Sequence, residues 1–342
     1  MSFQITHSPH IHNQNSVTHV MLNVIYALIP GIMLYIWFFG WGIVVNILLA
    51  STVALSCEAA VLWLRKRPII PTLMDGSALV MAILLALTIP PLAPWWIICL
   101  GAALGIVMAK HLYGGLGNNN FNPAMVGYVM LLISFPVEMT QWPALASLSG
   151  HHVNLWDSIG ITFAGQPFGN FTLDSVTGAT ALDSMKTELG RFHTVDEIKA
   201  NPLFGDFGAK GWEWMGNAFF IAGCWLIYKK VITWHIPVAM LGSLFLIASI
   251  FYMLDPDVHP SPLFHIFSGA AIIGAFFIAT DPVSAATSNK GRLIYGAGIG
   301  ILTYVIRTWG GYPDGVAFAV LLMNMSAPMI DYYTQPRVFG QK

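Results

Sequence analysis

Long apolar runs dominate this chain and limit what it can fold into. Only 9% of its 342 residues are charged and 56% are hydrophobic, whereas a soluble domain carries about 25% charged residues. A surface so poor in charge is not stable in water, so we expect a chain that lies in membrane lipid. The net charge of −1 argues against a nucleic-acid partner, which requires a basic surface.

Ten apolar runs are expected to form transmembrane helices. A helix perpendicular to the bilayer needs about 20 residues to cross it, and several of these runs are shorter. Protein must therefore shield their ends from lipid. The runs are 21–40, 42–64, 77–91, 94–109, 124–136, 216–228, 235–254, 266–280, 293–309 and 315–330.

The distribution of Lys and Arg predicts the orientation, because positive residues collect on the cytoplasmic side. With both termini in the cytoplasm, ten basic residues lie on that side and only Arg307 lies in a short outer loop. The long polar segment 137–214 is then outside, which is the periplasm if the host is a Gram-negative bacterium. The cytoplasmic residues are Arg65, Lys66, Arg67, Lys110, Lys229, Lys230, Lys290, Arg292, Arg337 and Lys342.

Two halves of the sequence repeat each other. The motif from Asp75 to Thr88-Ile-Pro matches the motif from Ser268 to Thr280-Asp-Pro, and Gly114-Gly115 matches Gly310-Gly311. The third span and its copy cross in opposite directions, which predicts an all-α polytopic protein with two inverted five-helix repeats. The predicted organisation is a cytoplasmic tail (1–20), a first repeat (21–136), an extracytoplasmic segment (137–214), a second repeat (215–331) and a cytoplasmic tail (332–342).

The inversion sorts the polar motifs onto two faces. Thr88-Ile-Pro90 and the loop 310–315 are expected on the outer face. The Asn-rich loop 118–122 and Thr280-Asp281-Pro282 are expected on the cytoplasmic face. Asparagine amides both donate and accept hydrogen bonds, so this face suits either a ligand or simple helix capping. Capping and ligand binding stay open for Asn119, whereas Asn122 and Asp281, beside prolines, favour a ligand.

Other polar residues have less specific patterns. Glu58 lies inside the second span, where a carboxylate belongs either to an ion path or to a hydrogen-bonded core. His111 is expected at the membrane interface. The cysteines, Cys57, Cys99 and Cys224, lack the spacing of an iron–sulfur or zinc site, so we expect no cluster here. The histidines of the tail, His7, His10, His12 and His19, suit metal binding less well than a flexible tail.

The most specific motif is Asp174-Ser-Val-Thr-Gly-Ala-Thr180, in the outer segment. It resembles the acceptor for covalent attachment of flavin mononucleotide (FMN) through a phosphoester on Thr180. Gly178 and Ala179 let the chain extend into a modifying enzyme, and the threonine hydroxyl is the nucleophile. The alternative is a helix start capped by Thr177 or Thr180. We favour attachment, because capping does not explain all the specified positions of the motif together.

These motifs, together with Asn122-Pro-Ala and Thr280-Asp-Pro-Val-Ser, resemble the D subunit of the Rnf (Rsx) electron transport complex and the related B subunit of the sodium-pumping NADH:quinone oxidoreductase. The resemblance covers the whole chain. It implies covalent FMN on Thr180, with Asp174, Thr177, Gly178 and Ala179 as the rest of the motif. It also implies a non-covalent riboflavin near Asn119, Asn122 and Asp281.

The resemblance further implies a role in the bacterial inner membrane. The complex couples electron transfer between NADH and ferredoxin to Na⁺ or H⁺ movement, as a translocase. The sequence has no NADH fingerprint and no cluster-binding cysteines, so the other subunits of the complex (A, B, C, E and G) would supply these parts, and a flavin transferase would attach the FMN. Two alternatives stay open: a channel or carrier for a small solute such as urea, and a structural anchor for redox partners.

Overall fold

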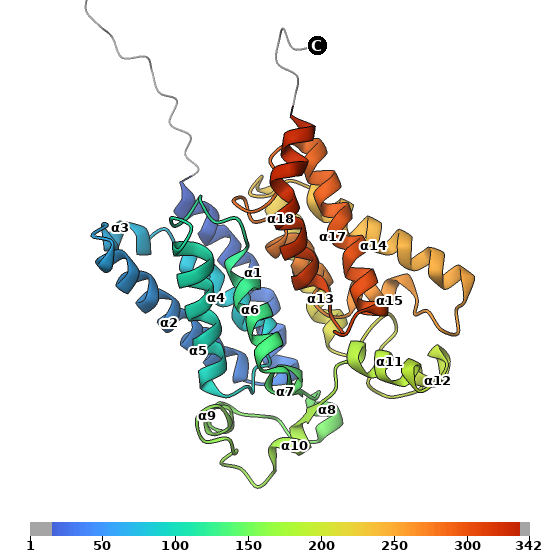
Figure 1. Ribbon diagram of the computed structural model, residues 1–342. Coiled ribbons are helices and arrows are strands. Elements are labelled where there is room, and N and C mark those ends of the chain that lie inside the picture. The colour runs from blue at the N-terminus through green and yellow to red at the C-terminus, as the bar shows by residue number, and fades with distance from the viewer. Residues whose placement is uncertain (1–15, 336–342) are drawn as a thin grey trace, which may run out of the picture.

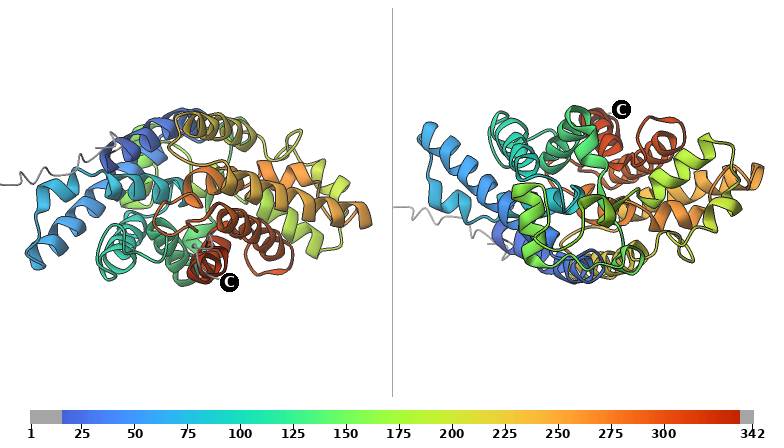
Figure 2. Two further views of the ribbon diagram at one scale, coloured as in Figure 1. Left: turned by 90° about the horizontal axis from the view of Figure 1, so that it is seen from above. Right: turned by 90° about the horizontal axis from the view of Figure 1, so that it is seen from below.

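The computed structural model describes residues 16–335, which are mostly helical (Figure 1). Two groups of helices stand side by side, and shorter helices lie across one end of them. The helix α1 begins and the helix α18 ends at the opposite end, which we call the termini face. The end that carries Thr180 is called the Thr180 face. Seen along this axis, the blue helices of the first half and the orange helices of the second lie at opposite ends of an elongated molecule (Figure 2).

The first half contains two long helices and several shorter ones. Its elements are α1 (Val17–Phe39), α2 (Gly42–Leu64), α3 (Ile69–Leu73), α4 (Ser77–Thr88), α5 (Trp95–Leu104), the π-helix η1 (Gly105–His111) and α6 (Pro123–Ser134).

The second half mirrors this mixture of long and broken helices. Its elements are α13 (Trp212–Tyr228), α14 (His235–Leu254), α15 (Pro262–Phe267), α16 (Ala271–Ile273), the π-helix η2 (Gly274–Ile278), α17 (Asn289–Trp309) and α18 (Val316–Thr334).

The segment between the halves forms short elements on the Thr180 face. They are α7 (Pro136–Thr140), β1 (Trp142–Pro143), α8 (Ala146–Ser149), α9 (Leu155–Ala164), α10 (Leu173–Val176), β2 (Thr177–Gly178), α11 (Ala181–Gly190) and α12 (Val195–Lys199). As the pattern Thr194-Val-Asp-Glu197 predicts, a capping box starts α12, with Thr194 and Glu197 each bonding the other's backbone N–H.

Polar side chains start the longer helices. The hydroxyls of Ser16 and Ser288 accept backbone N–H groups at the starts of α1 and α17, and the Asn122 amide does the same for α6. These caps satisfy donors that have no partner inside the helix.

One apolar core runs through both halves. Small residues let the helices of the two halves approach closely. At Gly31 of α1, an added Cβ would lie 2.2 Å from the ring of Phe219 on α13. Because any side chain at Gly31 would collide with that ring, the glycine sets how closely α1 and α13 pack.

Within residues 16–335, four helices are long and apolar enough to cross a membrane by length and composition. They are α1, α2, α14 and α18. Large apolar side chains such as Trp37, Leu48 and Met253 point outward from these helices and are exposed. An outer surface of this kind suits lipid, and the architecture fits a polytopic membrane protein.

Most of the expected apolar runs coincide with helices, with two informative differences. The fourth run continues from α5 into η1. The eighth is not one helix: α15 ends at Phe267, and a new helix starts at Ala271. Each half contains such a break, and a glycine with left-handed φ lies at both, Gly76 (+78°) before α4 and Gly269 (+64°) before α16.

The expected ends of the membrane segments shift by a few residues. Residues 17–20, predicted as tail, are the first turn of α1. His7, His10 and His12 of the predicted tail, together with Arg337 and Lys342, lie outside the described residues.

Two of the basic residues used for the orientation argument are buried. The sequence places Lys110 on the cytoplasmic side and Arg307 in a short outer loop. Both are buried on helices, Lys110 in η1 and Arg307 in the last turn of α17. The reason is that each has polar partners inside the protein, which compensate for the loss of water.

Candidate functional site

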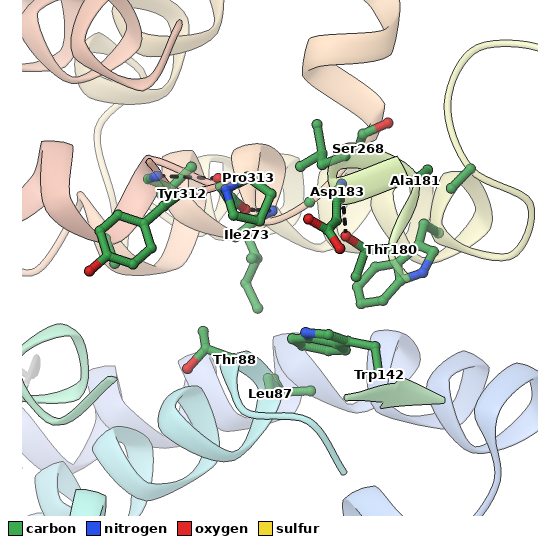
Figure 3. A pocket seen from close by; sticks show the side chains of 18 of the residues that line it. Leu87, Thr88, Trp142, Thr180, Ala181, Asp183, Ser268, Ile273, Tyr312 and Pro313 are labelled. Carbon is green, nitrogen blue, oxygen red and sulfur yellow. Dashed lines mark hydrogen bonds between the residues drawn. The ribbon is translucent and has the colours of Figure 1, made fainter. Parts of the chain in front are cut away.

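A cavity of about 310 Å³ lies between the two halves at the Thr180 face. Its size lies at the lower end of the range for small-molecule sites. Leu87, Thr88 and Trp142 line one side, and Thr180, Asp183 and Pro313 lie across from them (Figure 3). Two motifs predicted to share a face with Thr180, around Thr88 and in the loop 310–315, therefore meet it in one cavity.

Thr180 is the junction between a short strand and a helix. β2 pairs with β1 in antiparallel register, with Gly178 opposite Trp142, and α11 begins directly after Thr180. The Thr180 Oγ1 accepts the Asp183 N–H at 3.2 Å and so caps α11. Thr180 is therefore a helix cap, as the capping alternative predicts, and it also lines the cavity.

The rest of the heptad lies away from the cavity. Asp174, Gly178 and Ala179 are exposed, and the Thr177 hydroxyl donates to the Leu173 carbonyl at 3.1 Å. Only Thr180 of the motif lines the cavity. The exposed residues leave the approach to Thr180 accessible to another protein.

Aromatic residues form one end of the cavity. The Trp142 and Trp212 rings meet edge to face with centroids 5.3 Å apart, and the Tyr35 ring is 6.1 Å from Trp212. All three rings line the cavity. No sequence pattern pointed to this cluster, because Tyr35 belongs to α1, Trp142 to β1 and Trp212 to α13.

Two polar atoms of residues that line the cavity lack a hydrogen-bond partner in the part of the chain that the structure describes. The Tyr35 hydroxyl and the Ser268 Oγ are buried and make no hydrogen bond to any of residues 16–335. A buried polar group without a partner is costly. Both atoms are covered by protein, so they are unsatisfied positions behind the cavity wall and are not exposed to the cavity.

Arg307 and Asp314 fix the wall of the cavity nearest the second half. The Arg307 guanidinium donates to the His265 carbonyl (2.5 Å), the Ser268 carbonyl (3.0 Å) and Asp314 Oδ1 (3.1 Å). Asp314 Oδ2 accepts the Ala270 N–H at 2.7 Å, at the start of the broken helix. This network holds the loop 310–315 against the break before α16.

A lysine from α11 reaches the same loop. The Lys186 ammonium donates to backbone carbonyls at the end of α17 and in the loop after it, among them Gly310 at 2.5 Å and Tyr312 at 3.0 Å. Burial lowers the pKa of Lys186, and the nearby Asp183 carboxylate opposes this change. No sequence feature identified Lys186, since its partners are backbone atoms.

On the termini face, Asn122 joins the two halves. Its Oδ1 accepts the N–H groups of Ala124 and Met125, and its Nδ2 donates to the Ile278 carbonyl at 3.2 Å. Its own N–H donates to Asn324 Oδ1 at 3.1 Å. The Asn-rich loop and the end of η2 thus meet, as the inverted arrangement predicts, but the Asn122 amide is engaged with protein.

Asp281 and Asn119 lie in the same region. The carboxylate oxygens of Asp281 accept the Ser284 hydroxyl (2.8 Å) and the Val283 N–H (3.4 Å). Asn119 donates to the Phe121 carbonyl, whereas its buried Oδ1 has no partner among residues 16–335. Of the three residues predicted for a second flavin, Asn119 has the clearest free polar atom.

Glu58 is a hydrogen-bonded core group with a charged partner. Its Oε1 accepts from the Lys110 ammonium and lies 3.1 Å from His111 Nε2. Lys110 also donates to Ser77 Oγ at 2.7 Å. His111, expected at the membrane interface, is enclosed by protein and only 4% exposed, because the π-helical turn η1 directs both Lys110 and His111 toward Glu58.

Comparison with known proteins agrees with this arrangement. The chain matches the NQR2, RnfD, RnfE family over residues 4–340. It is 52% identical to the D subunit of the ion-translocating oxidoreductase complex of Aliivibrio salmonicida, over 100% of this chain and 99% of that protein. It is 48% identical to proteins of the same name from Aeromonas salmonicida (99% of each chain) and Escherichia coli (100% and 99%). The chain therefore belongs to the NQR2, RnfD, RnfE family.

Proposed function

We propose that this chain is the membrane flavoprotein subunit of an Rnf-type complex, with FMN attached to Thr180. The observation that carries the proposal is the position of Thr180: the last residue of the acceptor motif lies on the wall of a cavity between the two halves. The relatives that are about 50% identical over their full length are named as the D subunit of an ion-translocating oxidoreductase complex.

The local structure at Thr180 suits a phosphoester. Thr180 is the N-cap of the ten-residue helix α11, and a helix N-terminus presents unpaired N–H groups and a positive partial charge. Phosphate is stabilised at such a position. Attachment forms a P–O bond between Thr180 Oγ1 and the flavin phosphate. The hydroxyl loses its proton, and a flavin dinucleotide donor loses its nucleoside monophosphate.

The cavity suits the flavin ring. Trp142, Trp212 and Tyr35 supply aromatic and apolar surface, and the side chains of Thr88 and Asp183 supply polar groups for a ring edge. When bound, FMN supplies one-electron and two-electron transfer. The protein's part is to bind and orient the ring and to exclude water from it with the apolar walls of the cavity.

We further propose that the two halves are inverted five-helix repeats, with both termini in the cytoplasm of a bacterium and the Thr180 face outside its inner membrane. The matched breaks at Gly76 and Gly269 support the repeat. The other subunits of the complex (A, B, C, E and G) would supply the NADH site and the iron–sulfur clusters. The coupled ion, Na⁺ or H⁺, and the ion path belong to the complex as a whole.

A non-covalent riboflavin on the termini face is proposed with narrower support. Its predicted residues are Asn119, Asn122 and Asp281. The free Oδ1 of Asn119 favours a ligand there, whereas the side chains of Asn122 and Asp281 already bond to protein. Electron transfer between this flavin and the one on Thr180 would cross the membrane.

The decisive experiment expresses the chain together with a flavin transferase. We expect a fluorescent band on a denaturing gel under ultraviolet light and an intact mass increased by one esterified FMN, mapped to the peptide with Thr180. Thr180→Val should abolish both signals. Thr187→Val, at an exposed threonine of α11 outside the motif, is the matched control and should keep the flavin. Fluorescence that survives in Thr180→Val would refute the assignment.

The competing function is a channel or carrier for a small solute such as urea. It predicts colourless protein and solute flux through vesicles containing the purified chain alone. The acceptor motif at the cavity favours the redox function, because a solute pathway does not require an exposed threonine motif at its mouth.

A further inference from the structure

Lys186 is unusual among the charged residues between the two halves, because its ammonium reaches into the end of another helix. Four backbone carbonyl oxygens surround it. They are those of Ile306 (3.5 Å), Arg307 (3.1 Å), Gly310 (2.5 Å) and Tyr312 (3.0 Å). We call this set of contacts the Lys186 clamp.

The clamp has a clear electrostatic cause. The last carbonyls of a helix have no partner within it and carry the negative end of the helix dipole. At the end of α17 these carbonyls converge with those of the following loop on one point. An ammonium group has three donors and no acceptor, so Lys186 can bond to this group of oxygens without leaving an acceptor of its own unpaired.

The clamp connects two parts of one cavity wall that are far apart in sequence. Thr180, Leu182 and Asp183 at the start of α11 and the residues from Gly311 to Asp314 line the cavity, and both parts lie across from Leu87, Thr88 and Trp142 (Figure 3). Lys186 lies about 9 Å along α11 from Thr180, at about 1.5 Å per residue. Its bonds to the Gly310 and Tyr312 carbonyls therefore hold the helix that starts at Thr180 against the neighbouring loop of the same wall.

The loop itself is held independently of Lys186. Asp314 bonds to Arg307 and to the Ala270 N–H, so the loop stays anchored to the second half when Lys186 is removed. The helix α11 also keeps apolar contacts of Leu182 and Met185 with Phe264 and its neighbours. Loss of the ammonium should consequently free α11 relative to a fixed loop without unfolding either.

We propose that Lys186 is a positioning residue for the flavin: by clamping α11 to the end of α17, it fixes the attachment point at Thr180 relative to the cavity that receives the ring. The flavin part of this inference rests on the proposed function. The clamp rests only on contacts within the chain, so the two can be tested separately.

The test compares Lys186→Met with Lys210→Met, a matched control at an exposed lysine of the same segment. Amide hydrogen exchange of residues 181–190 is measured in protein expressed without a flavin transferase, where no flavin is attached and Thr180 still caps α11. The same lysine variants, expressed with the transferase, are then assayed for iodide quenching of flavin fluorescence and for the flavin midpoint potential. Lys186→Arg serves as the conservative variant, because its guanidinium also donates several hydrogen bonds.

We expect Lys186→Met to speed exchange in α11 roughly tenfold, since a hydrogen bond to a charged group is worth about that factor, and to increase iodide quenching and shift the potential. Lys210→Met should match the parent protein in all three measurements. Lys186→Arg should lie between Lys186→Met and the parent protein. Unchanged exchange in Lys186→Met overturns the clamp. If exchange in Lys186→Met is faster but quenching and potential are unchanged, the positioning role is overturned. If the parent protein carries no flavin, the proposed function is overturned, and the exchange result alone decides whether the clamp exists.

Discussion

Lys110 and Arg307 occupy matching places in the two halves of the molecule, on opposite faces. Lys110 ends the fourth helical unit of the first half and donates to Ser77 at the start of α4. Arg307 ends the fourth unit of the second half and donates to the Ser268 carbonyl just before α16. Each basic residue therefore holds a broken helix at the glycine where it restarts. This correspondence favours the inverted repeat, because sequence similarity alone would not place both contacts alike.

Replacing Arg307 should destabilise the protein strongly. Its side chain is 2% exposed and pairs with Asp314, and removing one partner of a buried pair costs about 3–5 kcal/mol. Because Asp314 keeps some contact with solvent, we expect Arg307→Met to lie near the lower end of that range, measured by thermal unfolding in detergent. Arg191→Met is the control: its pair with Glu188 is exposed, and such pairs contribute about 1 kcal/mol or less. Equal losses in the two variants would contradict the structure.

Glu58 and Lys110 should behave as one unit. Glu58→Ala leaves the Lys110 ammonium buried without its carboxylate, which should cost about 3–5 kcal/mol, whereas Glu58→Gln keeps a hydrogen-bond acceptor and should cost less. The double variant Glu58→Leu with Lys110→Met removes both charges and should recover much of the loss. A double-mutant cycle on unfolding free energy measures this coupling. Additive effects would mean that the two side chains do not interact.

The glycines at the two helix breaks should differ in their tolerance of alanine. Both have left-handed φ, which costs an alanine about 1–2 kcal/mol. An added Cβ at Gly269 would lie 2.5 Å from Asp314 Oδ2 and from Leu182 Cδ1, whereas at Gly76 the nearest atom is 3.3 Å away, in Met21. Gly269→Ala should therefore lower the unfolding temperature more than Gly76→Ala. A larger loss of unfolding temperature in Gly76→Ala than in Gly269→Ala would contradict the tighter packing seen at Gly269.

The sequence predicted the helices well because apolar runs and glycine–proline breaks are local signals. It also predicted that the loops around Thr88, Thr180 and Tyr312 share a face, since the repeat fixes the direction of each span. It could not predict the contacts of Lys110 or Arg307, because a basic residue at the end of an apolar run usually lies in a loop. The sequence also could not predict the wall of the cavity. Tyr35 and Ser268 come from elements far apart in the sequence, and only the packing of the two halves brings them together.

The capping box at Thr194 should make the start of α12 depend on pH. The Thr194 N–H donates to the Glu197 carboxylate at 2.8 Å, and this bond lowers the pKa of Glu197 below its ordinary value of 4.5. A carboxylate whose pKa is lower in the folded state than in the unfolded state stabilises the folded state. This contribution is fully present when the pH is above the unfolded pKa, and it is lost as the pH falls through the lower, folded pKa. Exchange at the Thr194 amide, corrected for its intrinsic rate, should thus lose protection below pH 4.5. Glu197→Gln keeps the acceptor without the charge and should show no such step.

Trp142 should affect the flavin more than any exposed tryptophan of the Thr180 face. Its ring lines the cavity and packs edge to face with Trp212, and an aromatic contact of this kind is worth about 0.5–1.5 kcal/mol beyond the area it buries. If the flavin ring occupies the cavity, Trp142→Leu removes part of its contact surface without touching the attachment point. The covalent fluorescent band should persist, while iodide should quench the flavin several-fold more efficiently, as expected when about 1 kcal/mol of binding is lost. Trp156→Leu is the control, since Trp156 is exposed on α9 and lies outside the cavity. Identical quenching in both variants would mean that the ring lies outside the cavity, even with FMN attached to Thr180.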